Sequence, residues 1–310
     1  MSRVLSLGTF VVVTAGILGC GPVSPEDSGG DGGVVDGGAP SIDADAGEVV
    51  SGYTQVSAGG YHSCGLQGDG TVECWGRDNH GQIRVPEGTF RQVSVHYWHS
   101  CGLRPGGEVI CWGDNEFLQA EGSNELFAQV SAGYWHSCGL QENGNVSCWG
   151  LDDGGRLDPP ASDFSAIEAG WFHTCGIRQG GTVECWGMNT DGQSDAPNGL
   201  FTQITAGSLH SCALDENGLA TCWGANDWGQ ASPPSDVFAQ IDAGAEHTCG
   251  VRLDQSVVCW GNDLKNQASP LAGTYRQVSA GLDHTCAVDT ENRVVCWGLN
   301  YHQQASPPNL

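Results

Sequence analysis

The chain has 310 residues and a formal net charge of -25, with 36 acidic against 11 basic side chains. Phosphate backbones repel a chain of this charge, so we expect no nucleic acid among its partners. Its 15 cysteines would be unusual in a reducing cytoplasm and are typical of proteins that mature in an oxidising compartment.

The N-terminus has the pattern of an export signal. Arg3 precedes an apolar run over 4–19, which is shorter than a membrane-spanning helix needs. The run ends in ILGC, which resembles the lipobox of bacterial lipoproteins, where Cys20 would be lipidated and would lead the mature chain. The alternative is ordinary cleavage with Cys20 left free. We predict a signal peptide over 1–20 and a location in the bacterial cell envelope or outside the cell, with the lipid anchor as the only membrane contact.

Residues 21–52 are rich in Gly, Asp and Pro and contain no aromatic side chain. Such a segment buries too little apolar surface to offset the entropy of ordering it, so we predict a disordered linker. The stretch DADAG at 43–47 offers carboxylates for calcium. It lacks the Gly and the distal Glu of an EF-hand loop, which favours a solvated linker.

From Tyr53 to the end, at 310, the chain repeats every 37 residues without an insertion, which gives seven units. Each unit reads as four short strands. A segment such as FAQVSA alternates apolar and polar residues, HSCGL and VSCWG flank a Gly-containing turn, and a shorter stretch such as QASPP follows. No helix of ordinary length fits. The pattern predicts an all-β, seven-bladed β-propeller with four-stranded blades over 53–310, closed as a ring.

The repeated pattern HTCALxxxGxVxCWGxNxxGQ resembles the regulator of chromosome condensation repeat, in the cysteine-containing variant found in bacterial secreted proteins. The resemblance covers 53–310 and implies a seven-bladed propeller. The eukaryotic founder of that family catalyses nucleotide exchange on a GTPase. The resemblance therefore implies this activity as an alternative function, which rests on family membership alone. Acidity and predicted export argue against carrying that function over.

Each unit holds two cysteines with nine residues between them. In a hairpin centred on Asp69, Cys64 faces Cys74, Leu66 faces Val72 and His62 faces Gly76, so a cross-strand disulfide fits. Zinc sites favour shorter spacings and a redox C-x-x-C is absent, so we expect no metal and no cofactor. The predicted disulfides are Cys64–Cys74, Cys101–Cys111, Cys138–Cys148, Cys175–Cys185, Cys212–Cys222, Cys249–Cys259 and Cys286–Cys296.

A His stands two residues before each first cysteine, and a Trp follows each second cysteine. A ligand-specific site would not recur in every blade. A shared structural role, such as a hydrogen bond from the His to a turn carbonyl, explains the His residues. The Trp residues are expected in the core between blades.

Function is expected where the repeats differ. The two residues before each His include at least one aromatic residue in the first four units and none in the last three, and they fall in the loop between the first and second strands. The loop after the third strand adds His80, Phe117, Trp228 and Tyr301 to the same side. Aromatic side chains on loops of a rigid scaffold are typical anchors of recognition. The predicted binding residues are Tyr61, Tyr97, Trp98, Tyr134, Trp135, Trp171, Phe172 and Trp228.

Two readings of these aromatic residues stay open, because the rings can also pack under the neighbouring blade. The favoured function is an exported, monomeric binding propeller that recognises a protein, or a glycan, through one loop face. Secreted propellers of the same family that inhibit β-lactamases are similar, because they also carry aromatic residues on one face. The alternative is a propeller enzyme with carboxylates in its channel, although Glu168 and Asp242 form no recognisable constellation and no catalytic residue stands out. We therefore expect no enzymatic activity.

Overall fold

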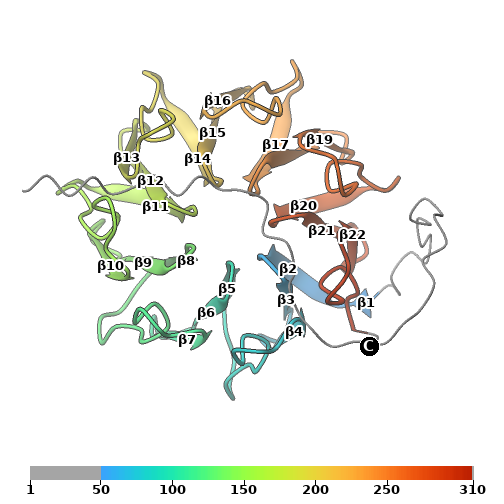
Figure 1. Ribbon diagram of the computed structural model, residues 1–310, viewed down its shortest axis with the longest axis horizontal. Helices are drawn as coiled ribbons and strands as arrows, with labels where there is room; N and C mark the ends of the chain where they lie inside the picture. Colours follow the sequence, from blue (N-terminus) through green and yellow to red (C-terminus); the bar gives the residue numbers. More distant parts are fainter. Residues whose placement is uncertain (1–49, 309–310) are drawn as a thin grey trace, which may run out of the picture. The chain divides into compact units, whose positions relative to one another are not determined.

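The described residues, 50–308 of the computed structural model, form seven antiparallel sheets around a central axis (Figure 1). This confirms the predicted all-β, seven-bladed propeller. The predicted signal peptide, Cys20 and almost all of the predicted linker lie outside the described residues. None of the described residues lies in a helix long and apolar enough to span a bilayer.

Each blade has an inner, a middle and an outer strand, counted from the axis. The inner strands are β2 (Tyr53–Ala58), β5 (Gln92–Val95), β8 (Gln129–Ala132), β11 (Phe164–Ala169), β14 (Phe201–Ala206), β17 (Phe238–Ala243) and β20 (Tyr275–Ala280). The middle strands are β3 (His62–Gln67), β6 (His99–Leu103), β9 (His136–Leu140), β12 (His173–Arg178), β15 (His210–Asp215), β18 (His247–Arg252) and β21 (His284–Asp289). The outer strands are β4 (Val72–Gly76), β7 (Val109–Gly113), β10 (Val146–Gly150), β13 (Val183–Gly187), β16 (Ala220–Gly224), β19 (Val257–Gly261) and β22 (Arg293–Gly298).

The prediction of four strands in every blade is wrong for six blades, which have three. The stretch around QASPP forms turns, because its prolines lack a backbone N–H donor and a backbone carbonyl there accepts a side-chain hydrogen bond instead of pairing with a strand. In the fifth blade, for example, the carbonyl of Gln230 accepts a hydrogen bond from the indole of Trp260, 2.9 Å away in the next blade.

The ring closes through the residues just before the first repeat. Strand β1 (Val50–Ser51) pairs antiparallel with β22 and adds a fourth strand to the last blade. The backbone N–H of Tyr53 donates to the carbonyl of Asn292, at 2.9 Å. Phe90 makes the equivalent bond to Gly70 at 2.7 Å, so the closing joint repeats the ordinary joint between blades.

Opposed cysteines join the middle and outer strands of every blade, as predicted. In the first blade the register pairs Cys64 with Cys74, Leu66 with Val72 and His62 with Gly76. All seven predicted disulfides are formed, with Cα atoms 4.0 to 4.1 Å apart. The cysteine face of one blade packs on the Trp-bearing face of the next, which builds seven core clusters between blades.

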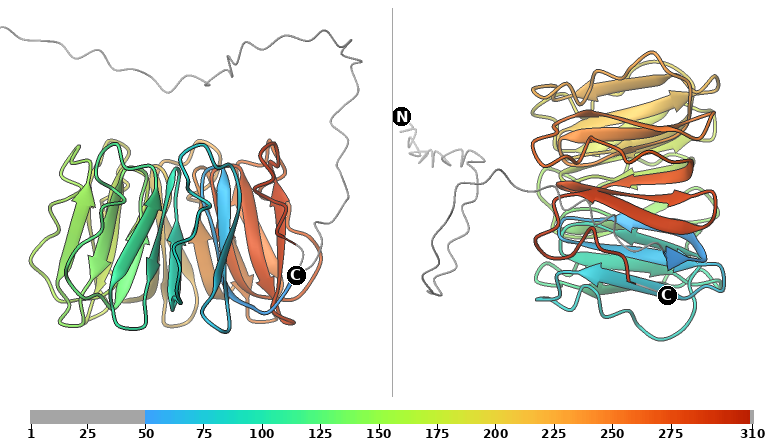
Figure 2. Two further views of the ribbon diagram at one scale, coloured as in Figure 1. Left: turned by 90° about the horizontal axis from the view of Figure 1, so that it is seen from below. Right: turned by 90° about the vertical axis from the view of Figure 1, so that its right-hand side faces the viewer.

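The ring has two faces, and the strands run between them (Figure 2). We call the side with the loops between inner and middle strands the loop face. The tight turns between middle and outer strands lie on the opposite side, the hairpin face. All the predicted binding residues except Trp228 belong to loops between inner and middle strands, and Trp228 follows an outer strand.

Candidate functional site

A closed ring of hydrogen bonds fixes the loops that carry the candidate site. Each repeated His begins a middle strand and is fully buried. Its Nε2 lies 2.7 to 2.8 Å from a Ser or Thr hydroxyl of the next blade, rather than from the turn carbonyl that was expected. The pairs are His62–Ser100, His99–Ser137, His136–Thr174, His173–Ser211, His210–Thr248, His247–Thr285 and His284–Ser63.

The hydroxyl partner fixes the form of the histidine. Ser137 donates its single hydroxyl hydrogen to the carbonyl of Gln119, at 3.0 Å, so it can only accept from His99. Nε2 of His99 therefore carries the hydrogen of this bond, and burial, which lowers the pKa of His99 to about 3, keeps the ring neutral. Its buried Nδ1 has no hydrogen-bond partner among the described residues, and the same holds for the other six histidines of the ring.

Burial lowers the pKa of these histidines far below the ordinary value, to about 3 for His99 and His284. A second proton would place a charge and an unpaired donor in the core. The histidines therefore serve the scaffold. Among the described residues, no group of His, Cys, Asp and Glu is arranged to hold a metal ion.

Seven of the predicted binding residues gather into one continuous group of rings, which we call the aromatic surface. It spans the loop face of the first four blades. Tyr97 lies at its centre, with ring centroids 5.2 Å from Tyr61, 4.7 Å from Trp98 and 4.5 Å from Tyr134. Its members are Tyr61, Tyr97, Trp98, Tyr134, Trp135, Trp171 and Phe172.

The rings of the aromatic surface pack on one another and also keep part of their area exposed. Tyr134 stacks on Trp171 at an interplanar angle of 12°, and the other contacts are tilted or edge-on. The hydroxyl of Tyr97 donates to that of Tyr61 at 3.1 Å. Burial, followed by this bond, raises the pKa of Tyr97 and keeps its hydroxyl protonated. The rings thus pack across neighbouring blades and still keep exposed area, and their role in binding stays a prediction.

The structure separates Trp228 from this group. It is 45% exposed on the fifth blade, and no ring contact joins it to the aromatic surface among the described residues. The loops after the outer strands do add His80 and Phe117, whose rings lie 5.0 Å from Trp98 and 5.5 Å from Trp135.

Sequence reasoning missed three residues of this region. The guanidinium of Arg77 lies over Trp98 at 5.0 Å and over Tyr61 at 5.5 Å, and the ring of His302 meets Tyr61 at 5.4 Å. His96 replaces a glycine that the other six repeats share, and its ring lies 5.7 Å from Trp171. Aligning the seven units position by position would have identified His96. Only the closed ring brings His302 next to the first blade.

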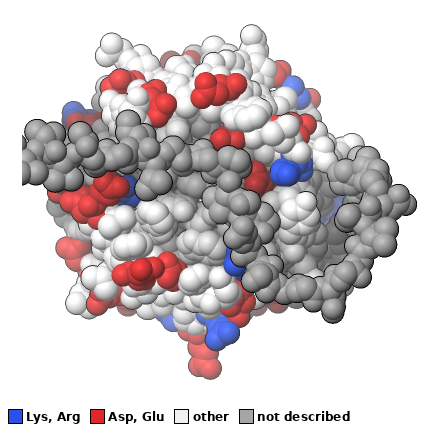
Figure 3. Space-filling model, viewed as in Figure 1, with Lys and Arg blue, Asp and Glu red and all other residues white. Residues whose placement is uncertain are grey.

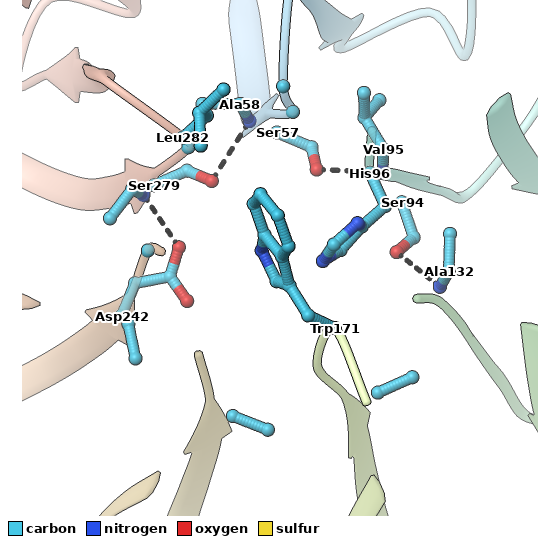
Figure 4. Close-up of a pocket in the computed structure, with 18 of the residues that line it drawn as sticks. Ser57, Ala58, Ser94, Val95, His96, Ala132, Trp171, Asp242, Ser279 and Leu282 are labelled. Carbon is cyan, nitrogen blue, oxygen red and sulfur yellow. Dashed lines mark hydrogen bonds between the residues drawn. The ribbon is translucent and has the colours of Figure 1, made fainter. Parts of the chain in front are cut away.

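Acidic residues stand on the loop face of the sixth and seventh blades. Glu246 and Asp283 take the places that the aromatic residues hold in the first four blades, and Asn262 donates to Glu246 at 2.7 Å. Figure 3 shows many acidic and few basic side chains on the face in view. Glu168 and Asp242 both line the central channel, as does Trp171. Figure 4 shows Asp242 and Trp171 in this lining.

The family model for the Regulator of chromosome condensation (RCC1) repeat matches the chain seven times. The matched residues are 53–82, 90–119, 127–156, 164–193, 201–230, 238–267 and 275–304. Each match begins at an aromatic residue, which is the first residue of the inner strand in five blades and lies two residues before it in the second and third blades. Each ends at the residue whose carbonyl accepts the indole hydrogen bond from the next blade. No curated protein matches the chain.

Solved structures share the architecture. The CRINKLY WD40 ectodomain of the Arabidopsis thaliana receptor kinase ACR4 is 25% identical, with a TM-score of 0.68 over 81% of this chain and 99% of that chain. The ectodomain of the Physcomitrella patens receptor kinase CR4 is 27% identical, with a TM-score of 0.69 over 80% of this chain and 74% of that one. Prp20p from Saccharomyces cerevisiae, studied for its binding to Gsp1p and histones, is 17% identical with a TM-score of 0.64, over 79% of this chain and 81% of that chain, and shows the fold alone.

Proposed function

The chain belongs to the regulator of chromosome condensation repeat family, and we propose that it is an exported binding module that recognises a protein partner through the aromatic surface. One observation carries this proposal. Seven aromatic side chains that the repeats do not share form a continuous, partly exposed group on one face of the ring. A scaffold needs no such group, because the other three blades close the ring without it.

The composition of the aromatic surface favours a protein partner. Tyr, Trp and Arg are the residues enriched at the energetic centres of protein interfaces, and Arg77 already lies over two of the rings. The loops are pinned at their ends by the buried histidines, so little ordering entropy would be lost on binding. The tilted rings leave an uneven surface, which suits inserted side chains better than a sugar stacked on one flat aromatic ring.

Seven disulfides and the likeness to receptor ectodomains indicate an extracellular or secreted protein. Lipidation at Cys20, which would tether the propeller to a bacterial membrane, is the finer part of the proposal and rests on the sequence ILGC. Metabolic labelling with a palmitate analogue tests it. Wild-type protein is expected to take up the label and the Cys20→Ser variant is not; unlabelled wild type would contradict the anchor.

The binding proposal is tested by capture of partners on the immobilised protein. We expect the Trp98→Ala/Trp135→Ala variant to lose the captured protein, because truncating an aromatic anchor that a partner covers costs on the order of 2 kcal/mol. The matched control is Leu126→Ala/Leu253→Ala, which truncates two apolar side chains of the hairpin face that are 60% and 70% exposed. Equal capture by wild type and both variants would show that the aromatic surface is not the binding site.

A further inference from the structure

Three departures from the sevenfold repeat meet at the loop-face end of the central channel. At one inner-strand position, five blades carry a hydroxyl that accepts a backbone N–H from the next blade. These five are Ser57, Ser94, Ser131, Thr205 and Ser279. The other two blades have Glu168 and Asp242 there. Figure 4 shows Asp242 together with His96 and Trp171, which project from nearby loops.

The two acids differ in how the propeller uses them. Asp242 takes over the work of the hydroxyl, since its Oδ2 accepts the N–H of Ala280 at 2.8 Å and its Oδ1 accepts from Thr205 at 3.0 Å. Glu168 accepts only from Ser131, at 3.1 Å through Oε1. No described residue bonds to its Oε2. Glu168 therefore bonds to the preceding blade as Asp242 does, but among the described residues it makes no bond to the next blade.

Both acids line one cavity of about 70 Å³ at the channel mouth. Trp171 and His96 form one side of the rim, and the buried Nδ1 of His96 has no hydrogen-bond partner among the described residues. Gly59 and Gly60 lie beside His96, since the backbone N–H of Gly60 donates to the carbonyl of His96 at 3.1 Å. Gly244, Gly281 and Leu282 also line the cavity. No Lys or Arg lines the cavity in the described part of the chain.

The pKa values of both carboxyl groups are raised, as expected for buried acids without a neighbouring positive charge. Burial, followed by the charge of Asp242, raises the pKa of Glu168 to about 8. Burial raises the pKa of Asp242 to about 6, although several hydrogen bonds act in the opposite direction. A cation in the cavity would remove this penalty, because it would stabilise the ionised form of both acids.

We propose that this cavity binds one organic cation, an alkylammonium or a guanidinium group, between the carboxylates of Glu168 and Asp242 and beside the indole of Trp171. The free Oε2 of Glu168 accepts a hydrogen bond from the cation, and the indole attracts it electrostatically. The cavity adjoins the aromatic surface, since Tyr134 stacks on Trp171. Resting on the proposed function, the Lys or Arg side chain of a protein partner is one source of the cation. A free amine is the other.

The test is a titration of the exported protein, followed through the indole N–H signal of Trp171 by NMR. The probes are n-butylammonium and methylguanidinium at about pH 8.5, where both acids are mostly ionised. Their neutral counterparts are n-butanol and methylurea. We expect the two cations to shift the Trp171 signal saturably and the neutral compounds to leave it unchanged. Equal shifts with neutral compounds, or no saturable shift, would overturn the proposal.

Charge variants complete the test. Glu168→Gln and Asp242→Asn keep the shape of each side chain, and we expect each to weaken cation binding at least tenfold. The control is Glu142→Gln on the hairpin face, which we expect to leave cation binding unchanged. Glu168→Ser restores the residue type of the other blades and guards against misfolding. Unchanged binding by Glu168→Gln and Glu168→Ser contradicts the site.

Partner capture separates the sources of the cation. If Glu168→Gln also reduces capture of the protein partner, the cation belongs to that partner. If capture is unchanged while butylammonium binding is lost, the ligand is a free amine. If Trp98→Ala/Trp135→Ala keeps its partner while the cations still bind, the proposed function fails and the cation site stands.

Discussion

Nε2 of His284, in the last blade, lies 2.7 Å from Oγ of Ser63, in the first blade. The hydroxyl of Ser63 donates in turn to the carbonyl of Gln304 at 3.0 Å, and the indole of Trp75 donates to the same carbonyl at 2.9 Å. The two ends of the described chain are thus joined by the same side chains that join every other pair of blades. The closure needs no device of its own beyond the short β1–β22 pairing.

Replacing Ser63 tests this closure. Ser63→Ala leaves the buried N–H of His284 without an acceptor, which costs about 1–3 kcal/mol, so we expect the free energy of unfolding to fall by that amount. Ser63→Thr is the matched control, because Thr occupies the same place in three other blades and keeps the hydroxyl. Urea unfolding measures both variants. Equal loss from the two, or none from either, would contradict the role of the hydroxyl.

We expect acid to destabilise the propeller, because the buried histidines resist protonation in the folded state. Their folded pKa is lowered from 6.5 to about 3 in His62, for example. Between these values the unfolded chain binds protons that the folded chain excludes, so stability is lost as the pH falls below 6.5. Each such histidine contributes up to about 1.4 kcal/mol per pH unit. We expect a steep drop in unfolding free energy between about pH 6 and pH 4.

Two variants check this pH dependence. His96→Gly restores the glycine of the other repeats and removes a histidine whose pKa burial also lowers to about 3, so the acid slope should decrease. Glu168 changes stability with pH in the opposite direction to the histidines. Its folded pKa is raised from 4.5 to about 8, so its contribution to the free energy of unfolding is lost as the pH rises through that range. Glu168→Ser should therefore gain stability most at about pH 8.5. Stability that stays constant down to pH 5 would refute the histidine account.

The sequence predicted the parts of this protein that repeat. The spacing of Cys64 and Cys74 gave the hairpin register and the disulfide, because a hairpin of fixed length pairs its strands in only one way. The aromatic character of the loops in the first four blades also predicted where Tyr97 and Trp135 would gather. A fourth strand was expected from the spacing, and the structure instead has turns around residues such as Gln230, whose carbonyl serves the next blade.

Contacts that depend on the closed ring could not be predicted from the order of residues along the chain. His302 meets Tyr61 only because the last blade lies beside the first, and Trp228 is excluded from the aromatic surface because its blade lies beyond the fourth. Glu168 and Asp242 are 74 positions apart, two repeats of 37 residues, in the sequence and share a cavity only because inner strands converge on one axis.

One joint between blades lacks a repeated clamp and offers a stabilising substitution. In six joints a Gln side chain both donates to and accepts from the backbone of the next inner strand, as Gln55 does with Val93 at 2.9 and 3.0 Å. Ala166 stands at this position in the fourth blade, opposite Ile204. We expect Ala166→Gln to raise the free energy of unfolding by about 1 kcal/mol, since it adds two such bonds.

Thermal unfolding of Ala166→Gln measures this gain, with Ala166→Met as a control of similar length that forms no clamp. A higher melting temperature for the Gln variant alone supports the clamp. A loss of stability in the Gln variant would show that the fourth joint is built differently from the others.

The most direct test of the central claim is footprinting of the captured partner complex with hydroxyl radicals, read residue by residue by mass spectrometry. We expect protection at Tyr61, Tyr97, Trp98 and Trp135 when the partner is bound, with Leu126 and Leu253 on the hairpin face as reactive as in the free protein. Protection confined to the hairpin face, with the aromatic surface unchanged, would contradict the account.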